Sequence, residues 1–187
     1  MASHTLFFCP PAWRDCLKPE IINVKVSPLG DDEIKEIVKI ERHPMVRKWL
    51  VEYTDEEFER ELEEYKRFFR EVQSNSRVDV LVAKTGGRVV GFLALWRMDD
   101  SGEQTTSIGI SVHPDYWGRG IATSLIKESI RLAREKGIKR LIIETLEENS
   151  AMRHVAEKLG FKLEEVRKKK IFKDGEYHDE VVYSLRL

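Results

Sequence analysis

Apolar positions in the first part of the chain follow the period of an amphipathic helix. In the stretch DEEFERELEEYKRFFREVQ, Phe58, Leu62, Tyr65 and Phe69 fall on one helical face. The segment DDEIKEIVKIE has the same spacing, and its acidic start suits a helix N-terminus. Helices are therefore predicted over residues 31–41, 45–53 and 55–73, after a first strand over 21–26.

From about residue 78 the pattern changes to runs of β-branched and apolar residues that are typical of strands. The first three runs are joined by the short polar segments TGG and DDSGEQ, which favours an antiparallel meander. Helical and strand patterns then alternate, with Gly137 and Gly160 as helix stops and a turn at Asp174-Gly175. This order predicts an α/β fold with a mixed, largely antiparallel sheet flanked by helices. Strands are predicted over 78–84, 88–98, 105–112, 139–146, 161–172 and 177–187, and helices over 118–137 and 149–160.

Length and charge limit the classes of protein that this chain can belong to. Its 187 residues are enough for one domain, and the prolines near the N-terminus predict an extension over 1–19 before a folded domain over 20–187. Lys and Arg number 32 and Asp and Glu 33, which gives a net charge of −1. Because this balance provides no basic field, nucleic acid is not expected as a partner, and any anion must be bound locally.

The two cysteines, Cys9 and Cys16, are too few for a disulfide framework and match no zinc-binding pattern, so no metal site is expected. The N-terminal stretch lacks the basic residues of a signal peptide, and no apolar run reaches the length of a membrane span. We therefore expect a soluble, cytoplasmic protein without a membrane partner.

The stretch HPDYWGRGIATSL places two glycines, Gly118 and Gly120, at the predicted start of the helix over 118–137. The first N–H groups of a helix have no intrahelical acceptor, and the helix dipole adds partial positive charge there. Glycine removes the side chains that would keep a ligand away from these donors, and Arg119 adds a local cation. The pattern predicts a site for a phosphate or pyrophosphate; the alternative is that both glycines only make a tight turn.

Two longer stretches, SVHPDYWGRGIATSLIKESIRLA and IIETLEENSAMRHVAEKLGFK, resemble the two signature motifs of the Gcn5-related N-acetyltransferases, the GNAT superfamily. The pattern around Trp117 is most similar to the branch that contains ribosomal-protein N-terminal acetyltransferases. In the family, the pyrophosphate loop reads Gln/Arg-x-x-Gly-x-Gly/Ala; here Trp117 takes the first position, and the last four positions match. The resemblance covers about residues 20–187 and implies the acyl-CoA N-acyltransferase fold.

The resemblance also implies an activity and a cofactor site. An acetyl group would pass from acetyl-CoA to a primary amine by direct attack in a ternary complex. The amine could belong to a protein N-terminus, a lysine or a small molecule. Trp117 can also be read as a packing residue, and Asn149 as a plain helix N-cap. The residues expected to bind acetyl-CoA are Ile110, Ser111 and Val112 at the pantetheine arm, Trp117, Gly118, Arg119, Gly120, Ile121, Ala122 and Thr123 at the pyrophosphate, and Asn149.

The catalytic groups of the family are not all present. Many members carry a tyrosine directly before EKLGF, where this chain has Ala156, and some carry a serine at the position of Met152. No general acid is therefore carried over, and a thiolate is an acceptable leaving group without one. The candidates for proton transfer are Glu144, His154, Tyr116, Tyr177 and Tyr183, and spacing does not choose among them.

Two other functions remain open at this point. The missing tyrosine and serine allow a non-catalytic protein that binds acyl-CoA. Gly118-x-Gly120 with Glu144 on the following strand imitates a dinucleotide fingerprint, although Thr123 stands where the third glycine should be. The sequence also leaves the acceptor and the oligomeric state open, with a homodimer among the alternatives.

Overall fold

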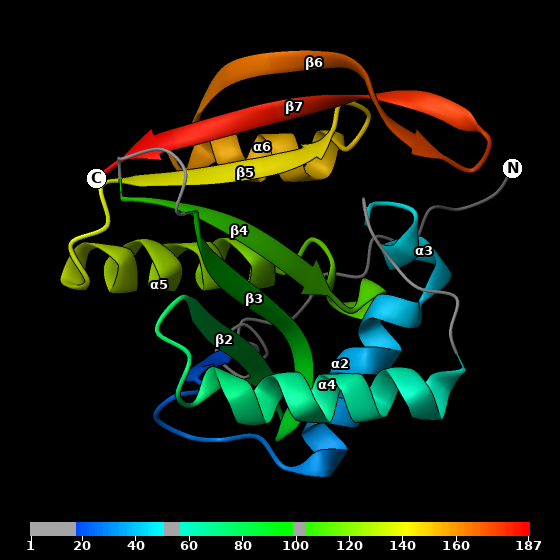
Figure 1. Cartoon of the computed structure of the whole chain (residues 1–187), viewed down its shortest axis with the longest axis vertical. Coiled ribbons are helices and arrows are strands. Elements are labelled where there is room, and N and C mark those ends of the chain that lie inside the picture. The colour runs from blue at the N-terminus through cyan, green and yellow to red at the C-terminus, as the bar shows by residue number, and fades with distance from the viewer. Residues whose placement is uncertain (1–17, 51–56, 99–103) are drawn as a thin grey trace, which may run out of the picture.

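The computed structural model describes residues 18–50, 57–98 and 104–187. Seven strands form one sheet in the order β1-β2-β3-β4-β5-β7-β6 (Figure 1). Every neighbouring pair is antiparallel except β4 and β5, which are parallel. The strands are β1 (Glu20–Asn23), β2 (Val78–Thr85), β3 (Arg88–Met98), β4 (Thr105–Val112), β5 (Arg140–Leu146), β6 (Lys162–Lys173) and β7 (Glu176–Arg186). The helices are α2 (Asp31–Arg42), α3 (Pro44–Arg47), α4 (Phe58–Val72), α5 (Ile121–Glu135) and α6 (Ser150–Lys158), with a 3₁₀ turn, η1 (Pro114–Tyr116).

Helices cover both faces of the sheet, so the molecule has three layers (Figure 1). On one face, α2 and α4 pack against Val80, Val82 and Phe92. On the other face, α5 packs against Leu81 and Leu93. Because β2 and β3 are covered on both sides, they read as nearly continuous apolar runs rather than as alternating ones.

The predicted α/β fold with a mixed, largely antiparallel sheet is confirmed. The first strand was predicted too long: it ends at Asn23, because the Asn23 carbonyl accepts the N–H groups of Val26 and Ser27 and the chain turns there. The helix predicted over 45–53 is the single turn α3, and residues 51–53 of that prediction lie outside the described residues.

A third correction concerns the glycines. The predicted helix over 118–137 begins at Ile121, three residues later than expected. Gly118 and Gly120 have φ values of 71° and 80°, in the left-handed region that glycine adopts without a steric cost. Both glycines therefore lie in the loop before α5 rather than in its first turn.

The pairing of β4 with β5 is short. Thr105–Ser107 pair with Arg140–Ile142, and beyond these residues the two strands separate toward their carboxyl ends, which Figure 1 shows as a widening gap. Over its full length β4 remains paired with β3. The second half of β4 therefore has an edge with no strand beside it inside an otherwise continuous sheet.

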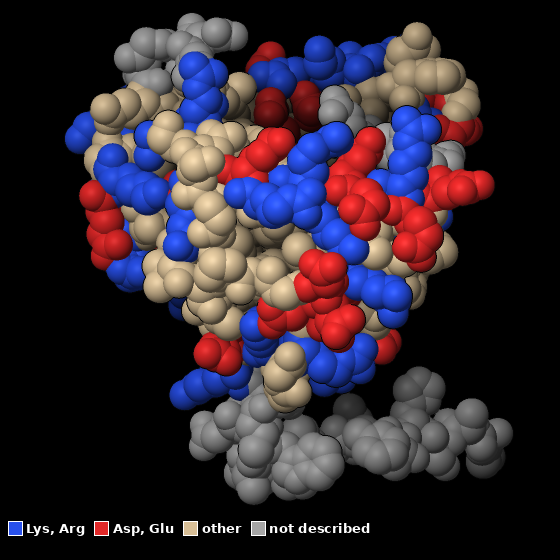
Figure 2. Space-filling model, turned by 60° about the horizontal axis from the view of Figure 1, so that its bottom comes forward, with Lys and Arg blue, Asp and Glu red and all other residues tan. Residues whose placement is uncertain are grey.

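The hairpin of β6 and β7 extends past the end of β5 toward α3 (Figure 1). Its turn is formed by Asp174 and Gly175, both with positive φ, as a two-residue Asp-Gly hairpin requires. Next to this turn, the Lys173 ammonium donates to the carbonyl oxygens of Lys48 and Leu50 at 3.1 and 2.6 Å. The hairpin thereby fixes the segment that follows α3. On the face in Figure 2, Lys and Arg are interspersed with Asp and Glu, so neither sign dominates it.

Candidate active site between β4 and β5

A cavity of about 810 Å³ lies where β4 and β5 separate, and it is lined by residues of both sheet faces. Side chains alternate between the two faces along a strand. On the face of α5 and α6, the lining includes Ile108, Ile110 and Thr145, and on the face of α2 it includes Ser111 and Glu144. The cavity therefore crosses the sheet, and two molecules could meet in it from opposite sides.

The N-terminus of α5 lies at the first of these faces. The first intrahelical bond runs from Ser124 N–H to the Gly120 carbonyl at 2.9 Å, so the three N–H groups before it have no acceptor within the helix. Gly118 and Gly120 line the cavity, and a Cβ added to either would meet no atom within 4 Å. The glycines therefore make a tight turn and at the same time leave the helix N-terminus open. Ile121, Ala122 and Thr123 also line the cavity.

The backbone of β4 offers hydrogen-bonding groups to the cavity at alternate residues. His113 N–H donates to the Val90 carbonyl at 2.8 Å, and hydrogen-bonded pairs alternate along an antiparallel ladder. The backbone groups of Ile110 and Val112 consequently face the gap, whereas those of Ser111 face β3. The Val112 carbonyl accepts the Trp117 indole N–H at 2.7 Å. Of the three predicted positions, Ile110 thus has the most open backbone.

Three more predicted cofactor residues have identifiable contacts. The indole bond to β4 makes Trp117 a packing residue that also lines the cavity. The Arg119 guanidinium lies over the Tyr116 ring, 5.2 Å from its centroid, and Arg119 is not among the residues that line the cavity. Asn149 lines the cavity and caps α6: its Oδ1 accepts the Met152 N–H at 3.1 Å and its Nδ2 donates to Thr145 Oγ1 at 3.0 Å. Cofactor contacts by these residues stay predictions.

The structure brings Glu144, His154 and Tyr116 to the cavity, but not the other two candidates for proton transfer. Tyr177 lies near the turn of the β6–β7 hairpin, 65% exposed, with its ring against Phe172. Tyr183 is fully buried.

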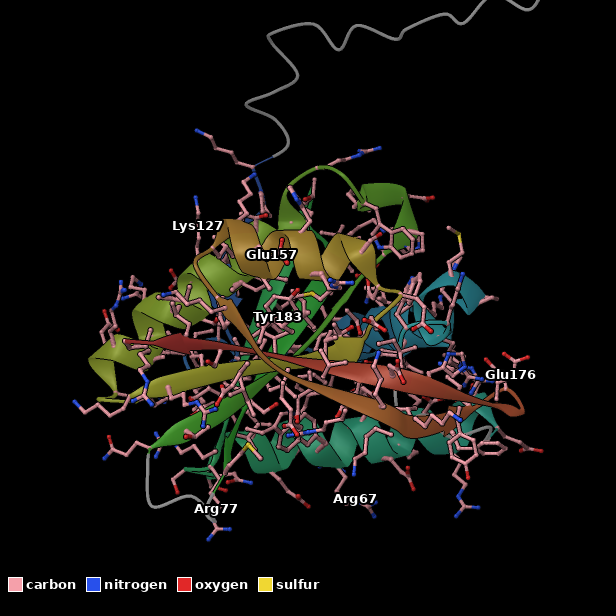
Figure 3. All side chains as sticks on the ribbon, turned by 90° about the horizontal axis from the view of Figure 1, so that it is seen from above. Arg67, Arg77, Lys127, Glu157, Glu176 and Tyr183 are labelled. Carbon is pink, nitrogen blue, oxygen red and sulfur yellow. The ribbon has the colours of Figure 1, made fainter. Side chains whose placement is uncertain are left out.

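The Tyr183 hydroxyl donates to Glu157 Oε1 at 2.7 Å and accepts from Arg153 Nε at 3.2 Å. Figure 3 shows Glu157 on α6 directly above Tyr183. Ala156, at the position of the family's tyrosine, is fully buried in the core. The Tyr183 hydroxyl is thus buried outside the cavity lining, and Ala156 has no group that could donate a proton.

Glu144 belongs to a charge cluster on the α2 face of the cavity. Its Oε1 accepts from Arg167 Nη1 at 2.8 Å, and the same nitrogen lies 2.9 Å from Oε2 of Glu180. Both carboxylates line the cavity. One guanidinium shared by two carboxylates leaves negative charge in the wall, which suits a cationic or amine ligand.

The carboxyl group of Glu41 also lies near the cavity, and the sequence did not predict a role for it. Ser111 Oγ donates to Glu41 Oε1 at 3.0 Å, across the interface between β4 and α2. Burial raises the pKa of Glu41 to about 7, against the lowering effect of the Ser111 bond, and the charge of Glu61 raises it further. The sequence does contain an indication of this buried carboxyl group, because Glu41 follows Ile34, Ile37 and Val38 at helical spacing and therefore lies on the apolar face of the helix.

The family model described as "Acetyltransferase (GNAT) family" matches residues 43–161. The chain belongs to the GNAT acetyltransferase family. It is therefore an acyltransferase of the N-acetyltransferase class, with acetyl-CoA as its acetyl donor. Family membership does not favour the non-catalytic acyl-CoA binder or the NAD(P)-dependent enzyme. A sheet with a single parallel pair is also unlike a doubly wound dinucleotide fold.

Individual relatives agree with this family. A Bacillus subtilis (strain 168) protein with the provisional name ribosomal protein bS18-alanine N-acetyltransferase is 26% identical over 109 residues, 58% of this chain and 70% of that protein. The L-amino acid N-acyltransferase MnaT of Escherichia coli (strain K12) is 32% identical over 84 residues, 44% of this chain. That match spans about half of MnaT, 49% of its length.

A solved structure agrees in fold. The phosphinothricin acetyltransferase of Sinorhizobium meliloti, in complex with AcCoA, has a TM-score of 0.76 at 18% identity, over 90% of this chain and 88% of that one. No helix among the described residues is long and apolar enough to span a membrane.

Proposed function

We propose that the protein transfers the acetyl group of acetyl-CoA directly to a primary amine while both substrates are bound in the cavity between β4 and β5. The observation that carries this proposal is that the cavity crosses the sheet, with the α5 N-terminus on one face and Glu144 on the other. Acetyl-CoA would bind from the face of α5 and α6, and the amine from the face of α2. Substrates that meet from opposite sides can react without a covalent acetyl-enzyme, because binding itself aligns them.

The half of the cavity on the face of α5 and α6, the donor half, suits both the pyrophosphate and the pantetheine arm of coenzyme A. The free N–H groups at the start of α5, with the partial positive charge of the helix, favour a pyrophosphate. The open backbone of Ile110 can pair with the amides of a pantetheine arm in the manner of an added strand. The glycines at 118 and 120 leave room for the phosphates to approach.

The half of the cavity on the face of α2, the acceptor half, contains the Glu144 carboxylate, which could take the proton of the amine. Attack forms the N–C bond and breaks the C–S bond, and the proton of the amine passes to Glu144, directly or through one water. The leaving thiolate takes up a proton from solvent or from Tyr116, the only tyrosine among the described residues that lines the cavity.

Initial-rate kinetics test the ternary complex. With acetyl-CoA and the amine both varied, we expect intersecting double-reciprocal lines, because both substrates must be bound before reaction. Parallel lines, together with an acetylated enzyme detected by mass spectrometry, would show a covalent route instead.

Glu144→Gln tests the base. We expect kcat to fall by about 10²-fold or more, the range of general-base catalysis, with unchanged affinity for acetyl-CoA. Glu165→Gln is the matched control, since Glu165 also accepts from Arg167, at 2.8 Å, but does not line the cavity. Equal losses in the two variants would mean that the charge balance at Arg167 matters rather than a base at 144.

A further inference from the structure

The acceptor half of the cavity has an apolar flank. Val46, Trp49 and Leu50 line it from α3 and the residues that follow, and Trp96 lines it from β3. Val46 is buried, whereas Trp49 and Leu50 are partly exposed and Trp96 is 42% exposed. Lys48 Nζ lies 4.7 Å from the Trp49 ring centroid, so this indole is already covered on one side by its neighbour. When a ligand covers apolar side chains that are partly exposed in a cavity, the removal of their surface from water stabilises the complex.

The apolar flank is held at both ends. At its start, Pro44 occupies the first turn of α3 and His43 Nδ1 accepts the Met45 N–H at 3.2 Å. At its end, the buried Lys173 ammonium binds the carbonyls of Lys48 and Leu50. A wall that is formed before the ligand arrives costs little ordering on binding, so contacts with it can discriminate between ligands.

The opposite flank is acidic. Glu144 and Glu180 share Arg167, which leaves the wall with negative charge. Among residues 18–50, 57–98 and 104–187, the only Lys or Arg that lines the cavity is Lys158, which is on α6 at the donor face. The acceptor half therefore attracts an ammonium group, and its described residues offer no lining cation to a carboxylate.

We infer that the acceptor carries a bulky apolar group next to its amine, and that this group packs against Val46, Trp49 and Leu50. The acceptor has no free carboxylate next to the amine. This inference rests on the proposed function and names the acceptor of that site. A free apolar amino acid and the N-terminus of a peptide with an apolar first residue share the amine and the side chain. Because no Lys or Arg among the described residues lines the acceptor half, the peptide is favoured, since its first residue carries an uncharged amide in place of the carboxylate.

Competing amines of simple structure test this inference. We expect kcat/KM for leucinamide to exceed that for glycinamide by about tenfold or more, the effect of covering an isobutyl group. We also expect free leucine to react more slowly than leucinamide. Equal kcat/KM for leucinamide and glycinamide would overturn the apolar subsite, and a faster reaction with leucine would overturn the exclusion of the carboxylate. If the protein binds acetyl-CoA but acetylates none of leucinamide, glycinamide and leucine, the proposed function is overturned, and this inference with it.

Variants of the wall separate recognition from folding. Trp49→Ala should reduce the preference for leucinamide over glycinamide by about fivefold, because it removes part of the covering surface. Met45→Ala is the control, since Met45 belongs to α3, is 51% exposed and does not line the cavity. If Trp49→Ala melts at a lower temperature, Leu50→Ala provides the same comparison. An unchanged preference in a folded Trp49→Ala or Leu50→Ala variant would overturn the inference.

Discussion

The Nζ of Lys173 lies 2.6 Å from the carbonyl oxygen of Leu50, although 123 positions separate the two residues in the chain. The same ammonium reaches the carbonyls of Arg47 and Lys48, and Lys173 is only 7% exposed. A buried lysine of the β6–β7 hairpin thus acts as the cap that α3 lacks in its own sequence. The acceptor half of the cavity depends on this long-range contact.

Replacing Lys173 should therefore loosen the acceptor wall more than the donor site. Lys173→Met leaves the carbonyls after α3 without their donor, so we expect a loss of about 1–3 kcal/mol in the free energy of unfolding. The KM for the amine should rise while the Kd of acetyl-CoA is unchanged, and Lys173→Arg should restore part of both. Chemical denaturation, calorimetric titration and initial rates measure these quantities. Lys170→Met, at an exposed position of the same strand, is the control, and an amine KM that is equal in both Met variants would contradict the prediction.

A carboxylate at position 120 should oppose the pyrophosphate. Because Gly120 has a φ of 80°, any side chain there adds strain, so the comparison needs a neutral residue of the same shape. We expect Gly120→Asp to bind acetyl-CoA at least about tenfold more weakly than Gly120→Asn, which is roughly 1.4 kcal/mol. Both variants should melt at similar temperatures, since Asn and Asp tolerate the left-handed region alike. Equal affinities by calorimetry would mean that the glycines serve only the turn.

Glu41 should make folding stability depend on pH. The pKa of its carboxyl is about 7 in the folded protein against an ordinary value of 4.5, so between these values the folded state holds a proton that the unfolded chain has lost. Its contribution to stability is therefore complete below pH 4.5 and decreases as the pH rises to 7, by up to about 3 kcal/mol.

Glu41→Gln removes this titration. We expect the variant to lose less free energy of unfolding than the wild type between pH 5 and pH 8, measured by urea denaturation at both values. Titrating groups that do not interact with Glu41 contribute equally to both proteins and cancel in the difference. Parallel pH profiles would show that the Glu41 carboxyl is ionised in the folded state at neutral pH.

Tyr183 should matter for stability and not for the reaction. Tyr183→Phe removes the hydroxyl between Glu157 and Arg153, and we expect a loss of about 1 kcal/mol in the free energy of unfolding. Because this hydroxyl lies outside the cavity lining, kcat should be unchanged. Tyr116→Phe is the comparison at a tyrosine that does line the cavity. A hundredfold loss of kcat in Tyr183→Phe alone would identify Tyr183 as the missing general acid.

The sequence by itself determined most of the elements and predicts where the donor end of the site lies. Strand and helix periods are local properties, so the runs from β2 to β7 could be placed from the order of apolar residues. The glycines at 118 and 120 likewise predict an open helix N-terminus, because the conformation of a turn depends on adjacent residues. The start of α5 was misplaced by three residues, because Gly-x-Gly is compatible with either a helix turn or a left-handed loop.

Only the tertiary structure decided the acceptor half of the cavity. The parallel pairing of β4 with β5 ends at Ser107 and Ile142, and no local pattern in the sequence encodes where a parallel pair ends. The bond between Ser111 and Glu41 spans 70 positions, and that between Lys173 and Leu50 spans 123. Likewise, spacing in the sequence does not distinguish Tyr183 and Tyr177 from the other candidates, and only the structure shows that both lie outside the cavity lining. Residue type shows which groups can react, but which of them meet depends on contacts between distant parts of the chain.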